Sequence, residues 1–140
     1  MTALAAATER KHKHAQNIVS YKVAASTVIH KGALVCINAS GYAIPGADTA
    51  GIKFVGVATE TVDNSSGSNG TLSVRVAKEY LGKFAKSGSI TIANLGTEVT
   101  IVDDNTVALA ATTTNDIPAG LISAVDDDGE LWIDTRLRAL

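Results

Sequence analysis

The sequence predicts an all-β fold, a compact barrel or sandwich of short strands that follows an extended N-terminal arm. Val, Ile and Thr make up 39 of the 140 residues, and these β-branched side chains favour strands over helices. Short alternations of apolar and polar residues recur between turn signals such as Ser40-Gly41 and Asp128-Gly129. In addition, two stretches of the chain repeat one another, which indicates a duplicated unit.

The repeat lies at about residues 28–76 and 92–135, where glycines and apolar residues follow in the same order. The matched positions are Gly32, Val35, Ile37, Ile52, Gly56 and Gly70 in the first stretch and Gly96, Val99, Ile101, Ile117, Gly120 and Gly129 in the second. The offset is 64 or 65 and falls to 59 at the last glycine, because the first stretch has the longer loop, from Asp63 to Gly70. We therefore expect a β-tulip or β-clip-like fold built from two related halves.

The chain divides into an arm, residues 1–17, and a single β domain, residues 18–140. The arm is rich in alanine, then basic, and has no β alternation, and a helix of this length is marginal in water. Strands are predicted at residues 18–23, 34–38, 42–44, 54–59, 72–76, 90–92, 99–102, 107–109, 121–125 and 131–134. One helical turn is predicted from Ala77 to Lys83.

Composition argues against several classes of protein. The apolar start from Met1 to Ala7 soon gives way to charged residues, so neither a leader nor a membrane span is expected, and synthesis in the cytoplasm follows. Cys36, the one cysteine, is predicted to be a buried thiol. The basic cluster from Arg10 to His14 has no aromatic residue within it, and the chain carries a net charge of −2, so no nucleic-acid partner is expected.

The sequence offers little for catalysis or metal binding. His12 and His14 stand between lysines, which would oppose a cation. The run from Asp126 to Glu130 lacks the ligand spacing of a calcium loop and predicts a hairpin turn. The segment from Gly82 to Gly88 lacks the glycines that wrap a phosphate, and no Gly-x-Ser-x-Gly elbow occurs. We therefore expect no enzyme, no cofactor and no metal site.

Charge is unevenly placed along the chain. Between Ser87 and Thr135 lie nine acidic residues and no basic one, whereas the rest of the chain holds all 12 Lys and Arg residues against five acids. Such a division favours contact between copies of the chain, or docking of the basic part on an acidic partner. The alternative is that the two parts interleave in space and their fields cancel.

Four segments carry a resemblance to a known family: Tyr21-Lys22-Val23 after the basic arm, Val28 to Val35, Phe54 to Ala58, and Gly129 to Asp134. Over residues 18–135 the chain resembles the small β-rich decoration, or cement, proteins of tailed bacteriophage heads. The resemblance implies a structural virion protein that binds the outer surface of the capsid as trimers and has no catalytic residues. Its partners would be the major capsid protein and further copies of itself.

The candidate residues follow from these expectations. Capsid contact is predicted for the arm and the strand after it, at Arg10, Lys11, Lys13, Ile18, Val19, Tyr21 and Val23. Self-association is predicted for the acidic half, at Asp103, Asp104, Asp126, Asp127 and Trp132. Two alternative functions remain open, a small ligand-binding module of the β-clip kind and a component of a phage head fibre or tail.

Overall fold

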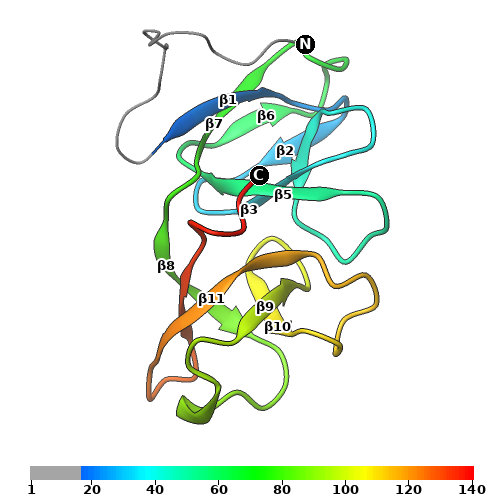
Figure 1. The fold of residues 1–140 in the computed structure, drawn as a ribbon. Coiled ribbons are helices and arrows are strands. Elements are labelled where there is room, and N and C mark those ends of the chain that lie inside the picture. The colour runs from blue at the N-terminus through cyan, green and yellow to red at the C-terminus, as the bar shows by residue number, and fades with distance from the viewer. Residues whose placement is uncertain (1–16) are drawn as a thin grey trace, which may run out of the picture.

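The computed structural model describes residues 17–140, and the prediction of an all-β fold is confirmed there (Figure 1). The predicted arm, apart from Asn17, lies outside the described residues. The strands are β1 (Ile18–Lys22), β2 (Thr27–Ile29), β3 (Leu34–Ile37), β4 (Ala43–Pro45), β5 (Lys53–Ala58), β6 (Val62–Asn64), β7 (Ser73–Ala77), β8 (Leu81–Lys86), β9 (Glu98–Ile101), β10 (Thr106–Leu109), β11 (Pro118–Val125) and β12 (Leu131–Asp134). A single 3-10 turn, η1 (Ile92–Asn94), precedes β9.

The two halves of the molecule have the same strand order. The first half forms a sheet in the order β1-β7-β5-β3-β4, and the second forms a closed barrel in the order β8-β12-β11-β9-β10. In the barrel, β8 and β10 close the ring by parallel pairing, which includes Val107 with Lys86. The first half has a matching parallel bridge, between Val23 and Ala43. Each half is thus a small five-stranded barrel, and the first is closed by one bridge only.

The pairing register corrects the sequence match at its end. Ala77 faces Ile18 and Val57 in the first half, as Asp134 faces Leu81 and Leu121 in the second. The last strand of each half therefore corresponds at an offset of 57 (134 − 77) rather than 59, because strand partners and not turn glycines decide which residues are equivalent. The register also extends the repeat to include β1 and β8.

Two apolar clusters divide the interior. One lies inside the first half and contains Val35, Val55, Val74 and Val76. The other fills the barrel and includes residues of the opposite face of β3 and β5, namely Leu34, Cys36, Phe54 and Val57. The first sheet is therefore buried on both faces, which explains why its two central strands are apolar at nearly every position.

Gly56 makes this double burial possible. The register between β3 and β5 shifts beside it, and its φ of +138° is a conformation that side chains rarely adopt. The resulting bulge lets Phe54 and Val57 point to the same face although they are three residues apart. A Cβ atom at Gly56 would lie 2.3 Å from the carbonyl oxygen of Ala77, so the close approach of β7 also requires glycine.

In the second half, the sheet face that corresponds to the barrel-facing side of β3 and β5 is more polar. Leu34 corresponds to Glu98 and Cys36 to Thr100, both at an offset of 64, on strands with the same partners. In the first half this face packs on the barrel, whereas Glu98 in the second half is half-buried and bonds Arg138 of the C-terminal segment. The residues on this face thus differ between the two halves because the first half packs it against the barrel, whereas the second half exposes it to solvent and to a charged partner.

Hydrogen bonds tie the two halves together at the seam between them. The main-chain N–H of Leu34 donates to the carbonyl oxygen of Asp104 at 2.8 Å. Asp48, from the first half, accepts hydrogen bonds at 2.8 Å from the main-chain N–H groups of Thr114 and Asn115 in the second. Because these N–H bonds favour the ionised carboxylate, the pKa of Asp48 is lowered.

Three local predictions differ from the structure. Residues 77–83 form the end of β7 and the start of β8 instead of a helical turn, because Leu81–Lys86 pairs with β12. Residues 90–92 are not a strand, since Thr91 caps η1 in a capping box with Asn94. The short paired strands β2 and β6 were not predicted; β6 belongs to the loop that lengthens the first half.

Candidate interaction surfaces

The outer edge of β1 leaves main-chain groups without a partner among the described residues. The strand pairs with β7 alone, apart from the closing bridge at Val23. Two flanking bonds, Val23 N–H to Leu72 and Lys78 N–H to Asn17, show that alternate residues of β1 bond to β7. Ile18 and Ser20 lie at the positions in between, so their N–H and C=O groups face away from β7. An extended peptide could pair with this edge.

The predicted capsid-contact residues have different environments. Ile18 is 42% exposed, and Val19 and Tyr21 are half-buried with their main-chain groups bonded to β7. Val23 is fully buried in the core of the first half, so its side chain has no surface for a partner. The strand pairs with β7, and its inward apolar side chains cover the interior of the first half. Arg10, Lys11 and Lys13 lie outside the described residues.

The start of β8 has an equivalent edge, with which no other part of the described chain pairs. The bond from Thr135 N–H to the Tyr80 carbonyl oxygen places the main-chain groups of Leu81 and Lys83 on the side opposite β12. The next outward residue, Ala85, is already paired with the β10 side of the barrel. The two duplicated strands thus present the same two-residue opening, which lies before the point of barrel closure.

An exposed apolar face flanks the β8 edge. Leu81 is 56% exposed, Trp132 36% and Leu137 73%, and half-buried Leu121 lies across β12 from Leu81. Leu121 and Leu137 also line a groove of about 360 Å³ with the Asp134–Arg136 ion pair. Exposed aromatic and apolar side chains among charged pairs are typical of protein contact surfaces.

Sequence reasoning selected Trp132 on this face but missed Leu81 and Leu137. Leu81 was assigned to a helical turn, so its outward direction could not be read from strand alternation. A β assignment of Leu81–Lys86 would have placed Leu81 on the same outward face as Lys83, which is the strand partner of Trp132. Leu137 lies beyond the last strand, where no periodic pattern indicates its exposure.

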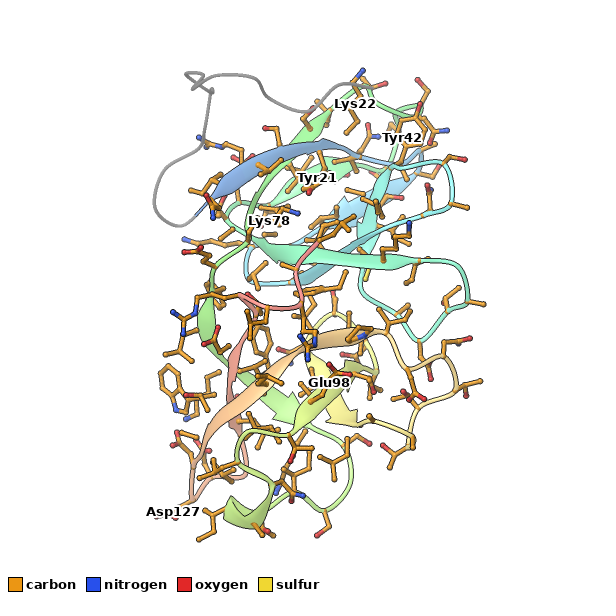
Figure 2. All side chains as sticks on the ribbon, in the orientation of Figure 1. Tyr21, Lys22, Tyr42, Lys78, Glu98 and Asp127 are labelled. Carbon is orange, nitrogen blue, oxygen red and sulfur yellow. The ribbon has the colours of Figure 1, made fainter. Side chains whose placement is uncertain are left out.

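The acidic turn between β11 and β12 is a hairpin held by a lysine. Lys83 Nζ lies 2.9 Å from Asp126 Oδ2 and 2.6 Å from Asp128 Oδ2, and Trp132 donates its indole N–H to Asp126 at 3.1 Å. Hydrogen bonds to the two carboxylates raise the pKa of Lys83, and the bond with Lys83 lowers the pKa of Asp128. Asp127 is exposed at the tip (Figure 2).

The remaining acidic candidates lie at the turn between β9 and β10, beside the seam. Asp103 bonds the N–H of Asn105 at 2.8 Å, and Asp104 lines a groove of about 340 Å³ with His30 and Lys31. The structure therefore separates the five self-association candidates into two groups. Asp103 and Asp104 lie beside the seam, and Asp126, Asp127 and Trp132 lie at the hairpin between β11 and β12. It does not bring them onto one surface.

Folding reduces the division of charge seen along the chain. Residues 81–140 contain nine acidic and four basic side chains, a net charge of −5, because β8 and the C-terminal segment bring lysines and arginines beside the acids. Four of the five ion pairs between described residues lie in this half. Residues 17–78 carry five basic and three acidic side chains, a net charge of +2.

Groups suited to chemistry are sparse in residues 17–140. No group of three or more His, Cys, Asp or Glu side chains there is arranged to hold a metal ion. Burial raises the pKa of the Cys36 thiol to about 12, which leaves it protonated and unreactive at neutral pH. None of the described helical residues forms a helix long and apolar enough to cross a membrane.

Comparison with known proteins identifies no relative of this chain. No protein-family model matches the chain, and neither curated proteins nor solved structures give a match.

Proposed function

We propose that this chain is a structural virion protein that binds the outer surface of a bacteriophage head and stabilises the capsid. The observation that carries the proposal is the edge of β1 at Ile18 and Ser20, with which no residue of 17–140 pairs and which follows the basic N-terminal segment in the sequence. A strand of the major capsid protein pairing there would gain main-chain hydrogen bonds with little demand on side-chain identity.

The rest of the described chain supports a binding role. Its buried side-chain polar atoms all have hydrogen-bond partners within the protein, so none of them marks an internal ligand site. The features suited to recognition are strand edges and the apolar face at Leu81, Trp132 and Leu137. That face is the proposed contact between copies in a trimer. Because many copies occupy one shell, modest individual contacts suffice to hold it.

The resemblance to decoration proteins points to the same role. It rests on the segments around Tyr21, Val28 to Val35, Phe54 to Ala58 and Gly129 to Asp134. In the structure these segments fall mainly in β1, β3, β5 and β12, which are scaffold strands. The resemblance therefore concerns the framework, and the capsid contact has to be tested directly.

The first test is the copy number in purified phage particles, measured by quantitative mass spectrometry against the major capsid protein. A ratio near one to one is expected for a decoration protein that covers the shell. A few copies per particle would favour a fibre or vertex component, and absence from the particle would refute the proposal.

The strand-edge contact has its own test, binding of Ser20→Pro to capsids that lack this protein. Proline removes the outward N–H of Ser20 without breaking a bond to β7, so the fold should survive while shell affinity falls at least about tenfold. Val19→Pro is the matched control, because its N–H faces β7 and its loss should lower stability. Unchanged shell binding by folded Ser20→Pro would show that β1 is not the contact.

A further inference from the structure

The segment at residues 23–25 closes the first half of the molecule. Val23 forms the closing bridge with Ala43, and the main-chain N–H of Ala24 donates to the Ala43 carbonyl oxygen at 3.0 Å. Among the described residues this is the one bridge that closes the first half. The contacts that hold the segment in place therefore also keep the first half closed.

Two consecutive residues of the loop before β7 bind this segment. Gly70 donates its main-chain N–H to the carbonyl oxygen of Val23 at 2.9 Å. Asn69 accepts a hydrogen bond at its side-chain Oδ1 from the main-chain N–H of Ala25, at 2.7 Å. One asparagine and the glycine after it thus hold both ends of the closing segment.

The surroundings of this residue pair limit its movement but leave the asparagine open to solvent. Asn69 is exposed and Gly70 is half-buried. A Cβ atom added at Gly70 would lie 3.3 Å from Lys22 Cδ and 3.5 Å from Tyr42 Cε1, and Figure 2 shows these two side chains at one end of the molecule. The main chain at Gly70 is therefore confined, whereas water reaches the side chain of Asn69.

Asn69 and Gly70 can also react with each other. They form the one Asn-Gly pair of the sequence, and a glycine has no side chain to shield its main-chain nitrogen from the carboxamide before it. The reaction requires the Gly70 nitrogen to leave its bond with Val23 and the Asn69 carboxamide to leave its bond with Ala25. In the closed structure both reacting groups are engaged with the same segment.

We propose that Asn69 is a site of covalent self-modification, which the closed first half suppresses and which opening of the loop releases. The nitrogen of Gly70 attacks Cγ of Asn69, the new N–Cγ bond forms, and the Cγ–Nδ2 bond breaks. Ammonia leaves and takes with it the proton of the Gly70 N–H. Water then opens the five-membered imide at either carbonyl, which gives aspartate or isoaspartate. This inference is independent of the proposed capsid role.

Isoaspartate would prevent the loop from binding the segment again. Its main chain runs through the former side-chain carbons and is one carbon longer, so the spacing that serves both Val23 and Ala25 is lost. The product aspartate keeps the length of the main chain and an acceptor oxygen at the same place. Formation of isoaspartate should therefore loosen the closing bridge at Val23 and leave the barrel of the second half intact.

The test is incubation of the full chain at one mildly alkaline pH, folded and in guanidinium chloride, with isoaspartate at residue 69 followed by peptide mass spectrometry. Peptide mapping separates this site from Asp128-Gly129, which can form the same imide with loss of water. The folded protein should react at least about tenfold more slowly, because two hydrogen bonds have to open first. Equal rates in the two states, or an unfolded chain that stays unmodified at Asn69, would overturn the proposal.

Asn64→Ala tests whether opening of the loop controls the rate. Buried Asn64 donates to the carbonyl oxygens of Ala24 at 2.9 Å and Ser68 at 3.1 Å, so its loss should raise the rate at Asn69 several-fold in the folded protein. Gly32→Ala is the matched control, because it lowers stability at a position where an added Cβ atom meets nothing within 4 Å. A rate in Asn64→Ala no higher than in Gly32→Ala would contradict the role of the loop.

Amide hydrogen exchange measures the effect of the product on closure. The N–H groups of Ala25 and Gly70 should exchange faster in the purified isoaspartyl protein than in Asn69→Asp, which carries the same charge without the longer main chain. This comparison does not depend on whether Asn64→Ala folds. Equal protection of both N–H groups in the two proteins would refute the effect on the closing segment.

Discussion

Substitution of Gly56 by alanine should destabilise this protein far more than the same change at another glycine with positive φ. The matched control is Gly32, whose φ is +88° and where an added Cβ atom would meet nothing within 4 Å. At Gly32 the cost is conformational, about 1–2 kcal/mol. At Gly56 the φ of +138° adds a similar cost, and the new Cβ would lie 2.3 Å from Ala77 O and 2.6 Å from Val76 Cγ1.

The steric part at Gly56 cannot be relieved by rotating a side chain, because the nearest atom belongs to the main chain of β7. Strain of this kind costs a further ~1–3 kcal/mol, so Gly56→Ala should lose about 2–5 kcal/mol in all. That is a large fraction of the stability of a domain of this size. The loss should also disturb the seam, since the bulge at Gly56 orients Phe54 and Val57 toward the barrel.

Urea unfolding followed by the fluorescence of Trp132 and by circular dichroism measures both variants on one scale. The expected result is a midpoint for Gly56→Ala well below that of Gly32→Ala, which itself lies slightly below the parent protein. Equal losses for the two variants would refute the close packing of β5 on β7 and the bulge that follows from it.

Three further predictions concern the side chains of Asn64, Cys36 and Lys78. Asn64→Ala should cost about 2–3 kcal/mol, because buried Asn64 donates to the carbonyls of Ala24 and Ser68, and a loss below about 0.5 kcal/mol in urea unfolding would contradict this role. The Cys36 thiol, with its pKa raised to about 12, should react with a disulfide reagent only as fast as the protein unfolds; immediate reaction of the native protein would show that it is accessible. Burial lowers the pKa of Lys78 to about 8 in the folded protein, whereas an unfolded chain has a pKa of about 10.4 at this lysine. Between these two pKa values the unfolded chain binds more protons than the folded protein. The free energy of unfolding should therefore rise between pH 8 and 10 in the parent protein and not in Lys78→Met.

The local pattern of the sequence was sufficient for the fold class and for most strands. Alternation and β-branched residues place β3, β5, β7, β9 and β12 within one or two residues of their observed bounds. These strands are set by a period of two, which can be read without knowledge of the partner strand. The acidic run at Asp126 to Asp128 was likewise predicted as a hairpin turn from its composition.

Strand partners decided the places where local reading was wrong. The segment at residues 77–83 contains good helix formers, yet pairing of Leu81 and Phe84 with β12 makes it a strand, since tertiary contacts outweigh small differences in propensity. This one error hid the free edge at Leu81 and Lys83 and the apolar face beside it. At β1 the strand itself was predicted, but its pairing with β7 and the burial of Val23 were not.

The sequence by itself determined that this is a β protein with two related halves, because side-chain period and turn chemistry are local properties. Only the tertiary structure decided which face of each half is buried and which edges stay open. Leu34 and Glu98 occupy equivalent positions, but one packs on the barrel and the other bonds the C-terminal segment. Burial and free edges depend on what lies opposite each strand, and residues distant in the chain supply that.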